Sequence, residues 1–206
     1  MAAPLDPARF YGEHIPRQFN AALDAEQERG EAGRRVHAAM RAVNATIQVV
    51  VEGTDGGTFF LNIREGQMEA GAGADRPPFL TLLQDRHGFD RLAEETGDSA
   101  LALLGGLSGI TGELKFTRDR IERLREIDGL VRFEVTGEGG FALRTHFGET
   151  PVPNAPKTTI SVEDADYRAL RSGDLDAQEA FMTQRIRVDG DMQAALQLAM
   201  AALEDA

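Results

Sequence analysis

Residues 173–203 read GDLDAQEAFMTQRIRVDGDMQAALQLAMAAL, and this stretch contains three short elements. Asp176 followed by Glu179 has the spacing of a capping box, which predicts a helix that begins at Asp176. Residues 185–188 alternate charged and apolar side chains, the period of a half-buried strand. The stretch therefore predicts a short helix followed by a strand.

A second helix is predicted to end this stretch. The turn at residues 189–191 offers a carboxylate to the free N–H groups at the start of that helix. Its apolar residues recur at helical spacing, so they are expected to share the face that covers a sheet. These residues are Met192, Leu196, Ala199, Met200 and Leu203.

The stretch resembles the closing segment of the sterol carrier protein type 2 family. An N-terminal Pro…Phe-Asn pattern of the family also has a counterpart here, in Pro16, Phe19 and Asn20. The resemblance implies a tunnel beneath the closing helix that accepts sterols, acyl chains or other lipids. The matching residues of the closing segment are Gly173, Leu175, Ala180, Phe181, Met182, Ile186, Val188, Gly190, Asp191 and Met192.

Two departures from the family pattern stand out. Many members have Trp in the second strand of the hairpin, whereas this chain has Phe59-Phe60 and Phe141 and no Trp. The last residues, 204–206, are not a peroxisomal address of the Ser-Lys-Leu type.

Composition and charge exclude several classes of protein. Apolar residues make up 42% of the 206, which fits a globular protein, and no apolar run is long enough to span a membrane. With 22 basic and 34 acidic residues the net charge is −12, so nucleic acid is not an expected partner. Without Cys there is no disulfide framework, and the N-terminus shows no secretory signal. We expect a cytoplasmic protein without stable membrane insertion, for which transient membrane contact stays open.

The first half of the chain predicts helices followed by strands. Asp6-Pro7 reads as a helix start, and a longer helical segment is expected from Ile15 to about Val43, interrupted near Gly30 and Gly33. From Ala45 the period changes to two, which predicts a hairpin turning at a glycine-rich loop. Later expected elements are a third strand (67–72), an apolar run (79–83), short helices (89–97 and 100–104), a strand (113–116) and a helix capped by Asp119.

The same order of events then starts again. A second hairpin is predicted over 131–147, followed by a Pro-rich loop, a strand at 158–162 and a helix carrying Tyr167 and Leu170. The ordered matches favour an internal duplication over a single enlarged domain with a coincidental extra hairpin. The expected organisation is a helical segment (1–44), a first sterol-carrier-like unit (45–128) that keeps the closing motif poorly, and a second unit (129–206). The fold class is α+β, with a twisted, mostly antiparallel sheet covered on one face by helices.

Little in the sequence points to catalysis. The four histidines are scattered without metal-ligand spacing, and the carboxylates fit capping and solvation. Residues 106–110 read GLSGI and lack the second glycine of a nucleophile elbow, and no phosphate-binding glycine motif is present. We therefore expect no metal, no cofactor and no enzymatic activity. An enzymatic reading would rest only on the fusion of this domain to enzymes elsewhere.

Apolar residues carry the remaining functional signal. An ordinary dry core is the first explanation of such residues, and Met and Phe at a sheet–helix seam also make an adaptable ligand wall. With the resemblance, we expect a lipid carrier that binds a sterol, fatty acyl or isoprenoid lipid in an apolar tunnel between sheet and helices. The alternative is a scaffold or accessory protein of a lipid or isoprenoid-quinone pathway that acts through contacts with unidentified proteins. The predicted lipid-contacting residues are Phe133, Val135, Phe141, Leu143, Ile160, Phe181, Met182, Ile186, Leu196 and Met200.

Overall fold

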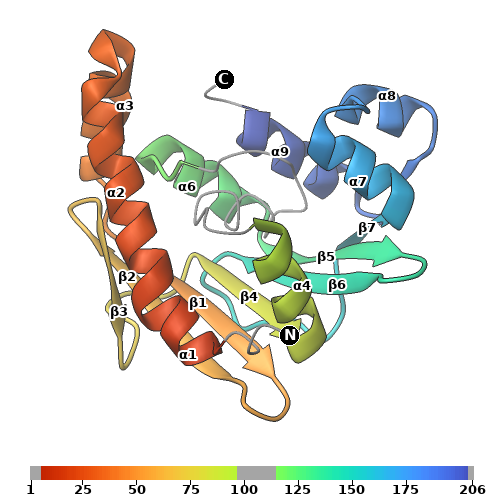
Figure 1. Ribbon diagram of the computed structural model, residues 1–206, viewed down its shortest axis with the longest axis horizontal. Coiled ribbons are helices and arrows are strands. Elements are labelled where there is room, and N and C mark those ends of the chain that lie inside the picture. The colour runs from red at the N-terminus through yellow and green to blue at the C-terminus, as the bar shows by residue number, and fades with distance from the viewer. Residues whose placement is uncertain (1–5, 97–114, 204–206) are drawn as a thin grey trace.

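The computed structural model describes residues 6–96 and 115–203, in which the strands form one eight-stranded sheet (Figure 1). The strand order is β3-β2-β1-β4-β6-β5-β7-β8. Five of the seven neighbouring pairs are antiparallel, and β1·β4 and β5·β7 are parallel. The predicted α+β fold is confirmed. The strands are β1 (Ala45–Glu52), β2 (Gly57–Arg64), β3 (Gln67–Gly71), β4 (Leu80–Asp85), β5 (Gly129–Thr136), β6 (Phe141–Phe147), β7 (Thr158–Glu163) and β8 (Ile186–Gly190).

Helices cover one face of this sheet. In both β1 and β5 the residues of one face are buried, while the opposite face is partly exposed over most of its length. Figure 1 shows the helices gathered on one side of the strands. No described helix has both the length and the apolar composition needed to cross a bilayer. The helices are α1 (Pro7–Arg9), the π-helix η1 (Phe10–His14), α2 (Ile15–Glu28), α3 (Gly30–Arg41), α4 (Arg86–Thr96), α6 (Arg118–Glu126), α7 (Asp164–Ser172), α8 (Ala177–Met182) and α9 (Met192–Leu203).

The N-terminal helices pack on the first half of the sheet. Asp6 caps α1 as predicted, and the break between α2 and α3 falls at Arg29, next to Gly30, whose φ of +75° suits glycine. Asn20 on α2 donates to the Met68 carbonyl at 2.9 Å and accepts from the Met68 N–H at 2.8 Å. Its amide therefore occupies hydrogen-bonding groups of edge strand β3, in the way that a further strand would.

The two hairpins have matching registers. Ala45 pairs with Ile63 in the first hairpin, and Gly129 pairs with Phe147 in the second, so both positions shift by 84 residues. Each first strand then pairs in parallel with the strand after the next connection, Ile47 with Leu80 and Val131 with Thr158. A helix follows each of those strands directly, α4 after β4 and α7 after β7. The hairpin, the parallel strand and the helix after it therefore follow one another in the same order in both halves, whereas β3 of the first half has no counterpart between β6 and β7.

Both hairpin turns depend on a glycine in the same place. A Cβ at Gly56 would lie 2.0 Å from the Val51 carbonyl oxygen, and one at Gly140 would lie 2.4 Å from the Val135 carbonyl oxygen. Real Cβ atoms do not approach backbone so closely, so neither turn accepts a side chain without moving. The glycine-rich loops singled out in the sequence are thus a requirement of the turn geometry.

The halves join through β4 and β6 at the centre of the sheet. These strands pair antiparallel from Leu80 opposite Phe147 to Leu83 opposite Arg144. The Gly148 N–H also donates to the Phe79 carbonyl at 3.0 Å. Sequence periodicity predicted β6 as a strand and identified β4 only as an apolar run, and it did not predict this pairing.

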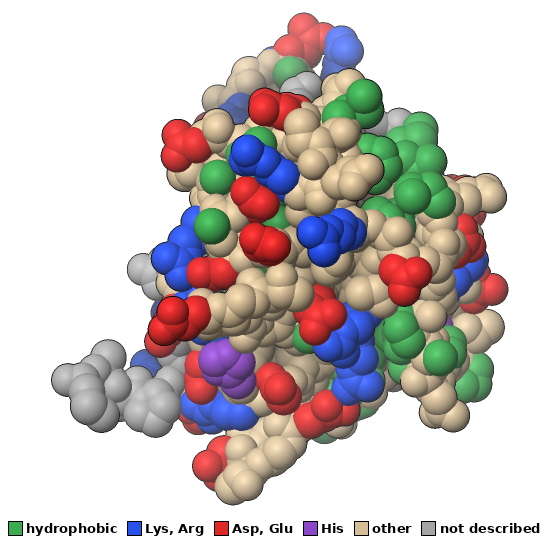
Figure 2. All heavy atoms as spheres, turned by 90° about the vertical axis from the view of Figure 1, so that its right-hand side faces the viewer, with side chains coloured by type: hydrophobic (Ala, Val, Ile, Leu, Met, Phe, Trp, Pro, Cys, Tyr) green, Lys and Arg blue, Asp and Glu red, His purple; other side chains and the backbone are tan. Residues whose placement is uncertain are grey.

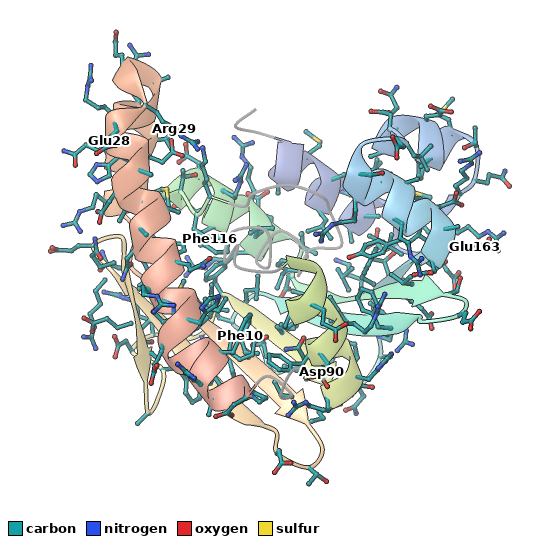
Figure 3. The ribbon with its side chains drawn as sticks, in the orientation of Figure 1. Phe10, Glu28, Arg29, Asp90, Phe116 and Glu163 are labelled. Carbon is teal, nitrogen blue, oxygen red and sulfur yellow. The ribbon has the colours of Figure 1, made fainter. Side chains whose placement is uncertain are left out.

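Two predictions at the start of α6 are wrong. The helix is capped by Thr117, whose side chain accepts from the Arg120 N–H, and Asp119 lies within the first turn. Lys115 and Phe116 are not in a strand, and their side chains contact the N-terminal helix and the core. Lys115 Nζ lies 2.9 Å from Glu26 Oε1. The ring centroid of Phe116, which is labelled in Figure 3, lies 6.3 Å from that of Phe19 and 5.5 Å from that of Phe79. The rest of that predicted strand (113–114), the predicted helix over 100–104 and the 106–110 motif lie outside the described residues.

A buried histidine on the outer face of the sheet links stability to pH. Burial lowers the pKa of His146, and Asp128 opposes this effect. Because the folded-state pKa lies below the unfolded value of about 6.5, folding favours the neutral ring. That stability is complete above about pH 6.5 and is lost as the pH falls from there through the folded-state pKa.

We expect the melting temperature to fall between pH 7.5 and 5, and to fall less in the His146→Asn variant. We choose Asn because Asn62 of β2 occupies the position in the first hairpin that His146 occupies in the second, 84 residues later. Thermal unfolding followed by circular dichroism in matched buffers measures the difference. Equal pH dependence in the two proteins would contradict a titrating role for His146.

Candidate functional site

The ten residues predicted to contact lipid fall into two groups. One group lies on the strands of the second half, and the other lies on α8 and α9. The strand residues are Phe133 and Val135 on β5, Phe141 and Leu143 on β6, Ile160 on β7 and Ile186 on β8; the helix residues are Phe181, Met182, Leu196 and Met200.

The strand group forms two apolar rows across the sheet. Strand pairing places Leu143, Phe133, Ile160 and Val188 side by side in one row, and Phe141, Val135, Val162 and Ile186 in the next. The rows are buried on β5 and β6 and become half-buried toward β8. We name them the apolar floor. The structure therefore brings the six predicted strand residues together and adds Val162 and Val188.

Tyr167 of α7 covers this floor and was not among the predicted lipid-contacting residues. Its ring centroid lies 6.0 Å from that of Phe133 and 5.6 Å from that of Phe141. Phe89 of α4 stands 78 residues earlier, the same shift that relates Leu80 to Thr158. An aromatic residue at this position of both helices was the signal that could have identified it.

The face of α9 that packs inward is not the one predicted. Its buried residues are Ala194, Ala195, Leu198 and Ala201, each 8% exposed or less, and the helix contacts α6, β7 and β8. Alanine side chains allow a helix to approach its neighbours closely, so this face fits the space better than a row of methionines. Three residues of the predicted covering face, Met192, Leu196 and Met200, are instead exposed.

Large apolar side chains are therefore left on the surface of α8 and α9. In the described part of the chain the exposed large apolar residues are Val152 and five residues of these two helices, which are between 41% and 74% exposed. On the face shown in Figure 2, hydrophobic side chains gather toward the upper right edge, while charged side chains are spread over the rest. The five residues are Phe181 and Met182 on α8 and Met192, Leu196 and Met200 on α9.

Met192, Leu196 and Met200 follow one another at intervals of four residues, so they lie along one side of α9. We name them the α9 outer row. No residue of α9 carries a charge. The prediction that these three residues share a face is consistent with helix geometry, and the prediction that this face covers the sheet is wrong.

Both helices of this region start at aspartate caps, as predicted. Asp176 accepts from the N–H groups of Gln178 and Glu179 at 2.8 and 3.0 Å. Asp191 accepts from the N–H groups of Gln193 and Ala194, and the Ala194 bond is the main cause that lowers the pKa of its carboxyl. These caps fix where α8 and α9 begin relative to β8.

A polar pocket of about 280 Å³ opens beside the apolar floor, where β5 and β7 end and β8 begins. Arg185 Nη1 lies 3.4 Å from Asp166 Oδ1 in its wall. None of the ten predicted lipid-contacting residues lines it. Over 6–96 and 115–203, no three His, Cys, Asp or Glu side chains gather as metal ligands.

Comparison with known proteins finds a family model that matches this region. Residues 113–202, 90 of the 206, match the model of the SCP-2 sterol transfer family. No curated protein matches the sequence. This part of the chain is therefore similar to the SCP-2 sterol transfer family, in agreement with the resemblance of its closing segment.

Solved structures of sterol carrier proteins also align with the chain. Sterol carrier protein 2 like 2 from Aedes aegypti is 20% identical over 40% of this chain and 92% of its own, with a TM-score of 0.29. Sterol carrier protein 2 from Yarrowia lipolytica, in its apo form, is 18% identical over 39% of this chain and 76% of its own, with a TM-score of 0.30. These TM-scores are too low for a detailed comparison of the folds.

Proposed function

We propose that the chain binds a hydrophobic lipid of sterol, fatty acyl or isoprenoid type and carries it between sites. The observation that supports this most is the concentration of exposed large apolar side chains on α8 and α9, beside the apolar floor and within residues 113–202. Large exposed apolar surface on a soluble domain marks a place where something apolar binds.

The binding energy would come from removing apolar surface from water, at roughly 25 cal/mol per Å². The floor supplies apolar side chains on four neighbouring strands, and Tyr167 supplies an aromatic ring above them. Methionines at the α8 and α9 surface suit ligands of varied shape, because the Met side chain is flexible and polarisable. A lipid seated against these helices would cover side chains that water otherwise contacts. In this proposal the ligand occupies an apolar tunnel between the floor and the helices.

The second candidate is a scaffold or accessory protein that binds no lipid. Its support is the same exposed row on α9, because an uncharged helix face with large apolar residues also suits a protein partner. In that case the floor is an ordinary filled core. The two candidates differ in whether a lipid stabilises the native state.

We also propose that residues 45–128 and 129–206 are two related units, the second with the better match to the family. The matching registers, the shared parallel pairings and the paired glycine requirements at Gly56 and Gly140 support a duplication. The family match, which begins at residue 113 and covers the second unit nearly to its end, agrees with the unequal quality of the two units.

Lipid binding is tested with a fluorescent fatty acid. We expect low-micromolar or tighter affinity and a melting temperature that rises with ligand concentration, because binding to the native state must stabilise it. The double variant Leu196→Ser/Met200→Ser should bind severalfold more weakly without a change in the melting temperature of the free protein. Val152→Ser is the matched control, because Val152 is exposed and lies outside α8 and α9.

The outcomes separate the candidates. Failure of sterols, fatty acids and isoprenoid lipids to bind or to stabilise the protein would favour the scaffold. Lipid binding that is equal in the wild type and the double variant would place the ligand away from the α9 outer row.

A further inference from the structure

Arginine is concentrated on α6, although the chain as a whole is acidic. The nine residues of this helix include four arginines. The full chain, in contrast, has a net charge of −12. Arg118 and Arg125 stand seven residues apart, two helical turns, so they share a side of the helix. That side borders a pocket.

The pocket has a volume of about 240 Å³ and lies between α6, the end of α3 and the loop before β4. It is smaller than the roughly 300–1,000 Å³ of sites for drug-sized molecules, so it suits a small group rather than a whole lipid. It shares no residue with the apolar floor or the α9 outer row. Its lining residues are Ala42, Val43, Asn44, Arg76, Arg118, Ile121, Glu122 and Arg125.

The two arginines of α6 that line the pocket, Arg118 and Arg125, make weak or single contacts. Arg118 Nη2 donates to the Ala42 carbonyl at a long 3.4 Å, and Arg125 Nη2 lies 3.0 Å from Glu149 Oε1. The Arg125 Nε is buried and has no hydrogen-bond acceptor among the described residues. The guanidinium of Arg125 is therefore held by its contact with Glu149 rather than by a full set of acceptors.

Arg76 supplies the third guanidinium, from the loop before β4. Its backbone N–H donates to Thr46 Oγ1 at 3.3 Å, which fixes the loop over the start of β1. Its side chain has no hydrogen bond or ion pair within 6–96 and 115–203. Asp75 attracts it only at longer range, because Arg64 already binds that carboxylate through Nε at 2.6 Å and Nη2 at 3.0 Å.

We propose that this pocket binds a phosphate group. Three guanidinium groups line it against one lining carboxylate, that of Glu122, and Glu149 pairs with Arg125 from outside the lining. Three positive charges therefore face two negative ones, and Arg76 and Arg118 have no carboxylate within ion-pair distance among the described residues. Arginine presents planar pairs of N–H donors that match phosphate oxygens, and phosphate offers more acceptors than a carboxylate. The inference does not depend on the proposed lipid function, because the two sites share no residue. The phosphate can belong to a free phosphomonoester or to the head group of a phospholipid.

Isothermal titration calorimetry at constant ionic strength tests the site with two probes, inorganic phosphate and dihexanoylphosphatidic acid below its micelle concentration. Arg76→Gln and, separately, Arg118→Gln should each weaken phosphate binding about tenfold, the effect of losing one charge-assisted contact. Arg35→Gln is the matched control, because Arg35 is an exposed arginine paired with Glu31 on α3. Its phosphate affinity should equal that of the wild type.

Equal affinity for the two probes, with the expected losses in the variants, supports the pocket as a site for soluble phosphate esters. Tighter binding of the phosphatidic acid, lost in the same variants, supports a head-group site. Absence of phosphate binding, or an equal loss in Arg35→Gln, overturns the proposal. None of these outcomes depends on fatty acid binding at the α9 outer row. The phosphate-site proposal and the lipid-binding proposal can therefore fail independently.

Discussion

Leu198→Ala is expected to lower the free energy of unfolding by about 2–5 kcal/mol, whereas Met200→Ala should change it by less than about 0.5 kcal/mol. The two residues are two positions apart on α9 and have side chains of similar size. Leu198 is buried, so its truncation leaves a cavity, while Met200 faces solvent and leaves none. The contrast measures which face of α9 is the core face.

Urea unfolding of the free protein at one pH and temperature determines both values. Leu196→Ala serves as a second exposed control and should resemble Met200→Ala. If Met200→Ala lowered the free energy of unfolding as much as Leu198→Ala, the α9 outer row would be packed against another part of the molecule when the protein is in solution. That result would also remove the support that the exposed row gives to the proposed function.

Separating the chain at the 128/129 boundary is expected to abolish folding of both parts. β4 and β6 are the fourth and fifth strands of the eight-stranded sheet, so they pair at its centre. Each would lose this partner strand after the cut. Leu80 and Phe147, buried and opposite each other in that pairing, would both become exposed. Open apolar strand edges favour aggregation over a monomeric fold.

Size-exclusion chromatography and two-dimensional NMR spectra of fragments 1–128 and 129–206 test this expectation. Refolding an equimolar mixture is the control, and it should recover the circular dichroism spectrum of the intact chain. Dispersed spectra and cooperative unfolding of fragment 129–206 alone would show instead that the second unit is self-sufficient.

Most strands could be predicted because the sheet has one buried face. In β1 and β5 the apolar residues alternate with polar or partly exposed ones, so period two is visible in the sequence. Caps such as Asp176 and turns such as Gly56 act locally, and local chemistry is what a short stretch of sequence encodes. The pairing of β4 with β6 was not predictable, because strand order depends on contacts between residues far apart in the chain.

The candidate site was predicted only in part, and for a specific reason. The floor residues were found because strand alternation assigns Phe133 and Leu143 to one face. The face of α9 was assigned wrongly because nearly every residue of that helix is apolar, so periodicity does not distinguish its sides. The decisive factor was the small size of Ala194 and Ala201, which matters only once the neighbours of the helix are known. The arginine pocket draws residues from three separate segments and has no local signal.

The central pairing of β4 with β6 also matters during synthesis. β4 ends at Asp85 and its partner β6 ends at Phe147, so about 60 residues must be added before the pairing can form. At about 5–20 residues per second, the nascent first half would wait roughly 3–12 seconds with that strand edge open. The edge at β3 needs no such delay, because Asn20 precedes it in the chain. On the ribosome, the β4 edge is therefore the place where a chaperone would be needed most.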